Sequence, residues 1–246
     1  MTLDDFSTGF DTLLNSYATT ASFGRAESPI SIELDEFEKS QFLTYAQKDY
    51  ALGIYTGKNT YGESFEQTEE IRRYLAPLVT EAELNPITNN TGNPIGMDGS
   101  NSYFFSLPDG TGAKPAVWFI TYESVTITDS ECSSHTSLEV TPAKQDEYSK
   151  LKKNPFRGAN NRRALRLDLN DDVIEIVSKY PVTKYYIRYL KKLKPIVLIN
   201  LGTENSIEGV NVATECELPD SVHRKILEIA VQKAIQSRGL NSSENK

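Results

Sequence analysis

The chain contains few of the residues on which most catalytic and metal sites depend. It has two cysteines and two histidines in 246 residues. Two cysteines do not make a disulfide framework, and a reduced, intracellular place of synthesis is the simplest interpretation. Neither His135 nor His223 belongs to a nucleophile motif, and no phosphate-binding or dinucleotide-binding fingerprint occurs. These absences argue against a hydrolase and against a nucleotide-dependent enzyme.

Long hydrophobic runs are missing as well. The longest apolar runs have about six residues, whereas a transmembrane helix needs about 20. The first residues are acidic and lack the apolar segment of a signal peptide, so we expect neither a signal peptide nor a membrane partner. With 38% hydrophobic and 24% charged residues, the composition is that of a soluble globular protein.

Charge is distributed unevenly along the chain, which has a net charge of −8. Residues 1–143 hold 7 basic and 21 acidic residues, a balance of −14. Residues 144–194 hold 14 basic and 6 acidic residues, a balance of +8, and the remainder has a balance of −2. Residues 144–194 therefore form a basic belt in an acidic protein, suited to nucleic acid, an acidic partner or the acidic part of another copy.

The N-terminal part has the pattern of helices. Apolar residues at spacings of three and four predict a helix over residues 3–20. A polar linker follows, so residues 1–30 are expected to dock separately, on another subunit for example. Asp35 is the expected N-cap of a second helix that Gly57 closes. A third helix is predicted from Thr68 to about residue 77, forming a helical hairpin with the second.

The pattern changes to a period of two from Tyr103 onward. Strands are predicted over residues 103–107, 116–128, 135–141, 164–169, 172–178, 184–190 and 196–201. The last of these is almost wholly apolar and is expected to be buried on both faces.

Helices complete the predicted fold. A short one is expected over residues 142–153, and a longer one after Pro219 with Val222, Ile226 and Ile229 in the core. The predicted class is α+β, with N-terminal helices, a central, mostly antiparallel sheet of about six or seven strands and a C-terminal helix.

The expected domain organisation is simple. We expect one domain over residues 31–240 with an inserted loop at about residues 84–101, and a disordered tail over residues 241–246. Residues 184–239 are expected to act as one rigid module.

Two sets of residues resemble metal ligands. Cys132, His135, Cys216 and His223 match the ligand types of a zinc site, but their spacing is irregular and cysteines also pack as small core residues. The acidic run 168–172 resembles a calcium loop, but calcium loops have more ligands and a glycine turn, so a solvated turn is favoured. We therefore assign no catalytic, cofactor-binding or metal-binding residue.

Aromatic residues interleave with the basic belt. Its side chains can contact a subunit or partner, form a solvated face, or bind nucleic acid, and composition alone leaves these three open. Among the residues of the belt, Arg188, Lys191 and Lys192 are the best candidates for contact with another chain. The residues are Lys150, Lys152, Lys153, Phe156, Arg157, Arg162, Arg163, Arg166, Lys184, Tyr185, Tyr186, Arg188, Tyr189, Lys191, Lys192 and Lys194.

Several long motifs occur in order along nearly the whole chain, from about residue 3 to residue 238. The motifs are IELDEFEKSQFLTYAQ (32–47), GESFEQTEEIRRYL (62–75), DEY (146–148), NPFR (154–157), RLD (166–168), YYIRYLKKLKP (185–195) and ECELPDSVHRKILEIA (215–230). They resemble the virion structural proteins of tailed bacteriophages, particularly the crAss-like phages.

The resemblance implies a non-enzymatic subunit of a homo-oligomeric ring, a dodecamer, in the virion neck or tail. Its implied partners are copies of itself, the portal, other ring proteins, and genomic DNA passing through the lumen without sequence-specific binding. Such a protein is made in the cytoplasm of the host bacterium. The alternative is a DNA-contacting virion protein packaged with the genome. Head-to-tail ring contacts join two different faces, which an acidic part and a basic belt supply.

Overall fold

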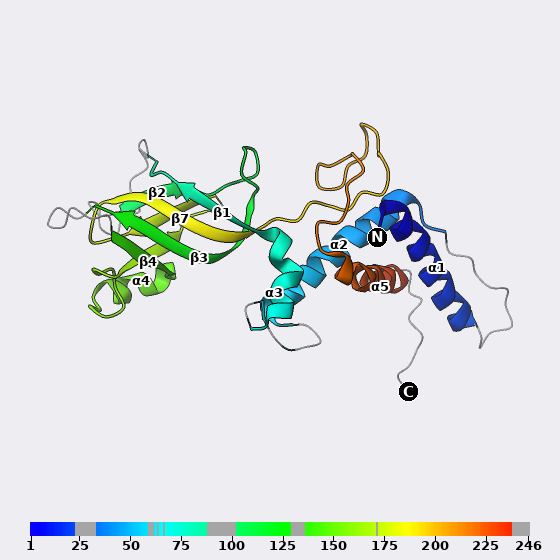
Figure 1. The fold of residues 1–246 in the computed structure, drawn as a ribbon, viewed down its shortest axis with the longest axis horizontal. Coiled ribbons are helices and arrows are strands. Elements are labelled where there is room, and N and C mark those ends of the chain that lie inside the picture. Colours follow the sequence, from blue (N-terminus) through cyan, green and yellow to red (C-terminus); the bar gives the residue numbers. More distant parts are fainter. Residues whose placement is uncertain are drawn as a thin grey trace. The chain divides into compact units, whose positions relative to one another are not determined.

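The chain forms two compact units (Figure 1). The computed structural model describes residues 1–22, 33–58, 62, 64–65, 67–87, 102–128, 136–170 and 172–237. One unit, here called the helical unit, comprises Met1–Leu78 and Leu193–Lys246, and the other, the sheet unit, comprises Val79–Lys192. The domain boundaries predicted from the sequence, at residues 30 and 240, differ from the bounds of these two units. The predicted boundaries stay a prediction.

The helical unit is built on three long helices. Its elements are α1 (Leu3–Ser22), α2 (Glu36–Thr56), α3 (Glu69–Leu75), the 3-10 turn η1 (Ala76–Leu78) and α5 (Asp220–Ser237). The helix α5 packs against both α1 and α2. Phe6, Phe10 and Leu14 of α1 are buried, and the Phe6 ring lies 5.2 Å from the ring of His223 on α5. The first helix thus docks on its own chain rather than separately.

Local signals set the ends of α2 as predicted. The Asp35 side chain accepts a hydrogen bond from the backbone of Glu38, and the Glu38 side chain accepts one from the backbone of Asp35. This reciprocal capping box satisfies two N–H groups that a helix start leaves unpaired. Gly57 closes the helix in the left-handed conformation. Both predicted ends of α2 are confirmed.

The predicted strand over residues 196–201 is wrong. Ile196, Val197 and Leu198 are buried as expected, but they lie in the helical unit and only Val197 forms an isolated bridge, with Thr214. Their backbone instead pairs with side chains of α2. Ile196 N donates to Thr44 Oγ1 at 3.1 Å and Leu198 N donates to Ser40 Oγ at 3.0 Å.

Polar side chains at helical spacing make this pairing possible. Gln47 Nε2 donates to Lys194 O at 2.9 Å, so Ser40, Thr44 and Gln47 form one polar stripe along α2. All three are buried. Buried backbone groups need partners, and here a helix rather than a neighbouring strand supplies them.

The sheet unit holds seven strands and one helix. They are β1 (Val79–Leu84), β2 (Ser102–Ser106), β3 (Val117–Ile127), β4 (Thr136–Pro142), α4 (Gln145–Lys152), β5 (Arg163–Asp168), β6 (Val173–Val177) and β7 (Val182–Lys191). The strand order is β1-β7-β3-β4-β5-β6-β2, and all pairs are antiparallel except β4–β5. The chain is therefore α+β with a mostly antiparallel sheet, as predicted.

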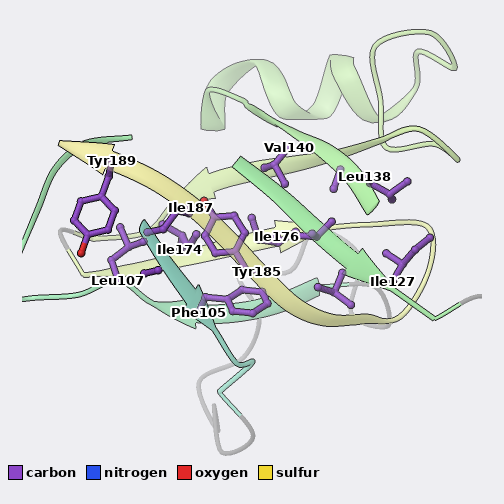
Figure 2. Close-up of a cluster of buried hydrophobic side chains, with 14 residues drawn as sticks. Phe105, Leu107, Ile127, Leu138, Val140, Ile174, Ile176, Tyr185, Ile187 and Tyr189 are labelled. Carbon is purple, nitrogen blue, oxygen red and sulfur yellow. The ribbon is translucent and has the colours of Figure 1, made fainter. Parts of the chain in front are cut away.

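The sheet curls around a core of alternate side chains (Figure 2). Phe105 on β2 contacts Tyr185 on β7 with ring centroids 5.2 Å apart, although the two strands are far apart in the strand order. Ile87 N, just beyond β1, donates to Phe104 O at 2.8 Å. On the other face of the sheet, Tyr148 of α4 packs against Leu165, Leu167 and Val177.

Strand β1 was not expected from the sequence. Glu81 and Glu83 alternate with Ala82 and Leu84 in a period of two, a signal that was present. The strand follows the third helix and its 3-10 turn directly, and Ala82 is its only fully buried side chain. Such a short, weakly apolar strand is specified mainly by its partner β7.

Residues 184–239 are not one rigid module. Strand β7 belongs to the sheet unit, and the segment from Leu193 onward belongs to the helical unit. Within α5, Val222 and Ile226 are buried as predicted. Ile229 is only half-buried, and Leu227 takes a buried position instead.

Candidate interaction surfaces

The basic belt of the sequence separates into three environments. Tyr185 and Tyr189 are core residues. Arg166 is largely buried, with a side-chain exposure of 13%. Lys194 lies in the helical unit, whereas the rest of the belt lies in the sheet unit. The belt is therefore not one continuous surface, and each part has its own role.

The β7 part of the belt is neutralised within the sheet. Lys184 pairs with Glu83 on β1, and Tyr186 donates a hydrogen bond to Glu81. Arg188 Nη2 lies 3.8 Å from Glu81 Oε2. Cross-strand pairs of opposite charge stabilise an antiparallel sheet by a few tenths of a kcal/mol each, up to about 1. Arg188, which was predicted to contact another chain, thus has a partner in its own chain. Lys192, which was part of the same prediction, is exposed.

A buried ion pair joins β3, β5 and β7. Arg166 Nη1 lies 2.6 Å from Glu123 Oε1, and the Tyr185 hydroxyl donates to Glu123 Oε2 at 2.6 Å. Arg166 Nε is 2.9 Å from Asp168 Oδ1, but its orientation misses a hydrogen bond. Burial raises the pKa of Glu123, opposed by the Arg166 charge and the Tyr185 hydroxyl, and burial raises the pKa of Tyr185. With partners on three strands, this ion pair has a structural role.

The largest remaining part of the belt is a mostly exposed segment that runs from the last turn of α4 to the first residue of β5. Residues 150–163, here called the basic loop, contain six lysines and arginines and no acidic residue. Asn154 Oδ1 accepts hydrogen bonds from Phe156 N and Arg157 N, and Asn160 Oδ1 accepts them from Arg162 N and Arg163 N. Asparagine caps of this kind hold a turn in one conformation.

A glycine lets the basic loop fold tightly on itself. A Cβ at Gly158 would lie 2.9 Å from the backbone oxygens of both Asn154 and Leu151. Gly158 N donates to Asn154 O at 2.8 Å. Only a residue without a side chain fits this close approach of backbone to backbone.

The basic loop presents an aromatic ring to solvent. Phe156 is 86% exposed, the highest value among the large hydrophobic residues of the described chain. It lines a surface hollow together with Glu139, Asn160, Asn161, Arg162 and Arg163. The side chains of Arg157 and Arg162 are exposed and form no ion pair with a described carboxylate. An exposed aromatic ring beside unpaired arginines has the composition of an interface centre.

The candidate metal ligands are used otherwise or lie outside the described residues. Cys132 and His135 are outside them. Both ring nitrogens of His223 are engaged, Nε2 with Leu218 O at 2.7 Å and Nδ1 with the Met1 ammonium at 3.1 Å. Burial raises the pKa of the Cys216 thiol to about 11, so the free thiol stays protonated at neutral pH. No group of three or more ligand-type residues clusters within the described residues.

The acidic run after β5 forms a turn. Asn170 Oδ1 accepts hydrogen bonds from Asp172 N and Val173 N at 3.0 and 2.7 Å. Asp168 faces Arg166 rather than the turn, and Asp171 lies outside the described residues.

Among the helices that the structure describes, none has the length and apolar character to cross a membrane.

Comparison with known proteins identifies the family. The phage tail ring protein 3/4 family matches residues 1–246. The chain belongs to this family. It is 46% identical over 241 residues to Ring protein 3 of Bacteroides phage crAss001, covering 97% of this chain and 96% of that protein. It is 26% identical over 243 residues to Ring protein 4/5 of the same phage, covering 95% and 92%.

Family membership confirms the predicted resemblance to crAss-like phage virion proteins. The ring protein is therefore a structural component of a phage tail. In such a protein the candidate functional groups are contact surfaces, and sequence reasoning located one candidate, the basic loop. It missed a second candidate, the acidic loop of the helical unit (residues 199–217), whose four glutamates without a lysine or arginine were a readable signal.

Proposed function

We propose that the chain is a non-enzymatic subunit of a homo-oligomeric ring in the portal-proximal neck or tail of the virion. Family membership along the whole chain supports a ring role. The observation that carries the proposal is the charge difference between the two units. The helical unit has a net charge of −8, and the sheet unit is neutral but carries the basic loop. Copies arranged head to tail bring such unlike surfaces together.

The ring would join head to tail and let DNA pass. Its neighbours would be the portal and other ring proteins, and the chain would be made in the host bacterial cytoplasm before assembly. A dodecamer is the copy number that we propose for this ring. With a net charge of −8, a ring whose lumen is acidic would repel phosphate and leave the genome free to slide, without sequence-specific binding.

Native mass spectrometry of the purified chain tests the ring. We expect a closed oligomer of a single copy number, with twelve copies the proposed value, and negative-stain images with a central hole. A chain that stays monomeric at concentrations of hundreds of micromolar would contradict self-assembly into a ring.

A DNA-contacting protein packaged with the genome is the second candidate, favoured by the unpaired arginines of the basic loop. Duplex binding measured between about 50 and 200 mM salt separates the two, because neutralising phosphates makes affinity fall steeply with salt. The ring proposal expects no binding at physiological salt. Tight binding there would favour the second candidate.

A further inference from the structure

We infer that the basic loop of one copy docks on the acidic loop of a neighbouring copy, with Phe156 at the centre of the contact. The inference rests on the proposed ring and names its interface. The two surfaces lie on different units, so the contact is heterologous, the kind that builds a closed ring when the rotation between copies closes.

The acidic loop is held in shape by backbone pairing. Residues 199–217 (orange in Figure 1) contain four glutamates and no lysine or arginine. Val197 and Thr214 form an antiparallel bridge, and Leu201 N donates to Asn211 O at 2.8 Å. Ala213 N donates to the Asn200 side chain at 2.9 Å. These bonds hold the two halves of the loop together outside the sheet.

A tight turn closes the acidic loop and is tied to α2. Ile207 and Val210 pair across the turn, with Glu208 at φ 51° and Gly209 at φ 81°. A left-handed Glu208 costs roughly 1 kcal/mol or more, and its carboxylate pairs with Lys48 on α2. The acidic loop is therefore preorganised, which lowers the entropy lost on binding.

Two aliphatic side chains of the acidic loop face solvent. Ile199 lies before the turn of the loop and Val212 after it, and they are 47% and 60% exposed. Glu204 and Glu215 are exposed and form no ion pair with a described cation. The loop thus offers two aliphatic side chains flanked by unpaired carboxylates.

The two loops are complementary in charge and in exposed apolar surface. The basic loop offers one exposed aromatic ring with arginines, and the acidic loop offers exposed aliphatic side chains with glutamates. Packing Phe156 against Ile199 and Val212 would remove apolar surface from water on both copies, and Arg157 or Arg162 would meet Glu204 or Glu215. Duplex DNA would satisfy the arginines but keeps the faces of its bases stacked inside the helix, so it offers the Phe156 ring little to pack on, and a second copy fits better.

Charge reversal tests this contact on the full-length protein. Arg157→Glu with Arg162→Glu reverses the two exposed arginine charges of the basic loop, and Glu204→Arg with Glu215→Arg reverses the two exposed glutamate charges of the acidic loop that the contact uses. Each double variant alone should fail to assemble, with a dissociation constant raised at least about 100-fold, because like charges then face each other. Mixed one to one, the two should assemble again, since both alternating contacts become complementary.

Matched controls separate charge from position. Lys144→Glu with Lys179→Glu makes the same charge change at exposed sites of the sheet unit outside the basic loop, and it should assemble like the wild type. Phe156→Ala should weaken assembly at least about tenfold, whereas Tyr122→Ala, which also removes an exposed aromatic ring, should not. Circular dichroism of each variant confirms the fold.

Sedimentation velocity distinguishes the failures. If the wild type assembles but both reversed variants assemble equally well, this contact is wrong and the ring proposal stands. If the reversed variants fail and their mixture also fails, the two loops are not partners. If the wild type itself stays monomeric, the ring proposal fails. If reversal of the basic loop abolishes only binding of duplex DNA, that loop is a nucleic acid surface and the inference is overturned.

Discussion

Individual residues in this chain have clearly divided roles along a single strand. Tyr185 and Tyr186 are neighbours on β7 and point to opposite faces of the sheet. The Tyr185 hydroxyl is buried against Glu123, whereas the Tyr186 hydroxyl donates to the exposed Glu81. The same chemical group is therefore structural at one position and peripheral at the next.

The two tyrosines give a matched pair of substitutions. Tyr185→Phe should lower the free energy of unfolding by about 1–3 kcal/mol, because buried Glu123 loses a hydrogen-bond donor. Tyr186→Phe should change it by less than about 0.5 kcal/mol, since its partner is exposed. Urea unfolding at neutral pH measures both, and equal losses would contradict a structural role for the buried ion pair.

The N-terminal ammonium fixes α1 on α5 through a single carboxylate. Met1 N lies 2.7 Å from Asp220 Oδ1. This hydrogen bond raises the pKa of the ammonium above its usual value of 8.0 and lowers the pKa of Asp220. A raised native pKa of a cation gives stability that is complete below pH 8 and is lost as pH rises through the native pKa.

Asp220→Asn tests this contact by its pH dependence. The difference in unfolding free energy between wild type and variant should be present near pH 7 and shrink toward pH 10. Other groups titrate in both proteins and cancel in the difference. Urea unfolding at several pH values, with retention of Met1 checked by intact mass, makes the measurement. A difference that is constant from pH 7 to pH 10 would contradict the contact.

Among the elements, α2 is unusual because it takes the place of a strand partner. Thr44→Val should cost about 2–3 kcal/mol, because it leaves the buried N–H and C=O of Ile196 without their partner at 3.1 and 3.2 Å. Thr56→Val on the same helix removes only an exposed bond to Leu52 O and should cost less than about 0.5 kcal/mol. Thermal or urea unfolding compares them, and similar losses would show that the stripe is dispensable.

Periodicity predicted most elements of this fold but not their partners. The alternation in β7 and the capping residues of α2 are local signals, and both predictions are confirmed. The run 196–201 has the composition of a buried strand, and the predicted burial is confirmed for Ile196, Val197 and Leu198. Its pairing with Ser40 and Thr44 involves residues about 150 positions earlier in the chain, which no local pattern reports. Composition also located the basic loop, but the exposure of Phe156 depends on Asn154 and Gly158 shaping the turn.

At the scale of the whole molecule, one chain contains two units that differ in charge. Ring proteins need two different surfaces per copy, and closure depends on the rotation that the contact imposes. A contact between the basic and acidic loops supplies both surfaces while the cores of the two units remain ordinary. Many weak contacts repeated around an axis then give a stable assembly.

Cryo-electron microscopy of the virion is the most direct test of the proposed ring. We expect one closed ring of this chain around the tail axis near the portal, with DNA or a channel at its centre. Neighbouring copies should be in contact through residues 150–163 and 199–217. A chain located with the genome inside the head, or a ring whose copies touch through other surfaces, would contradict the function or the interface respectively.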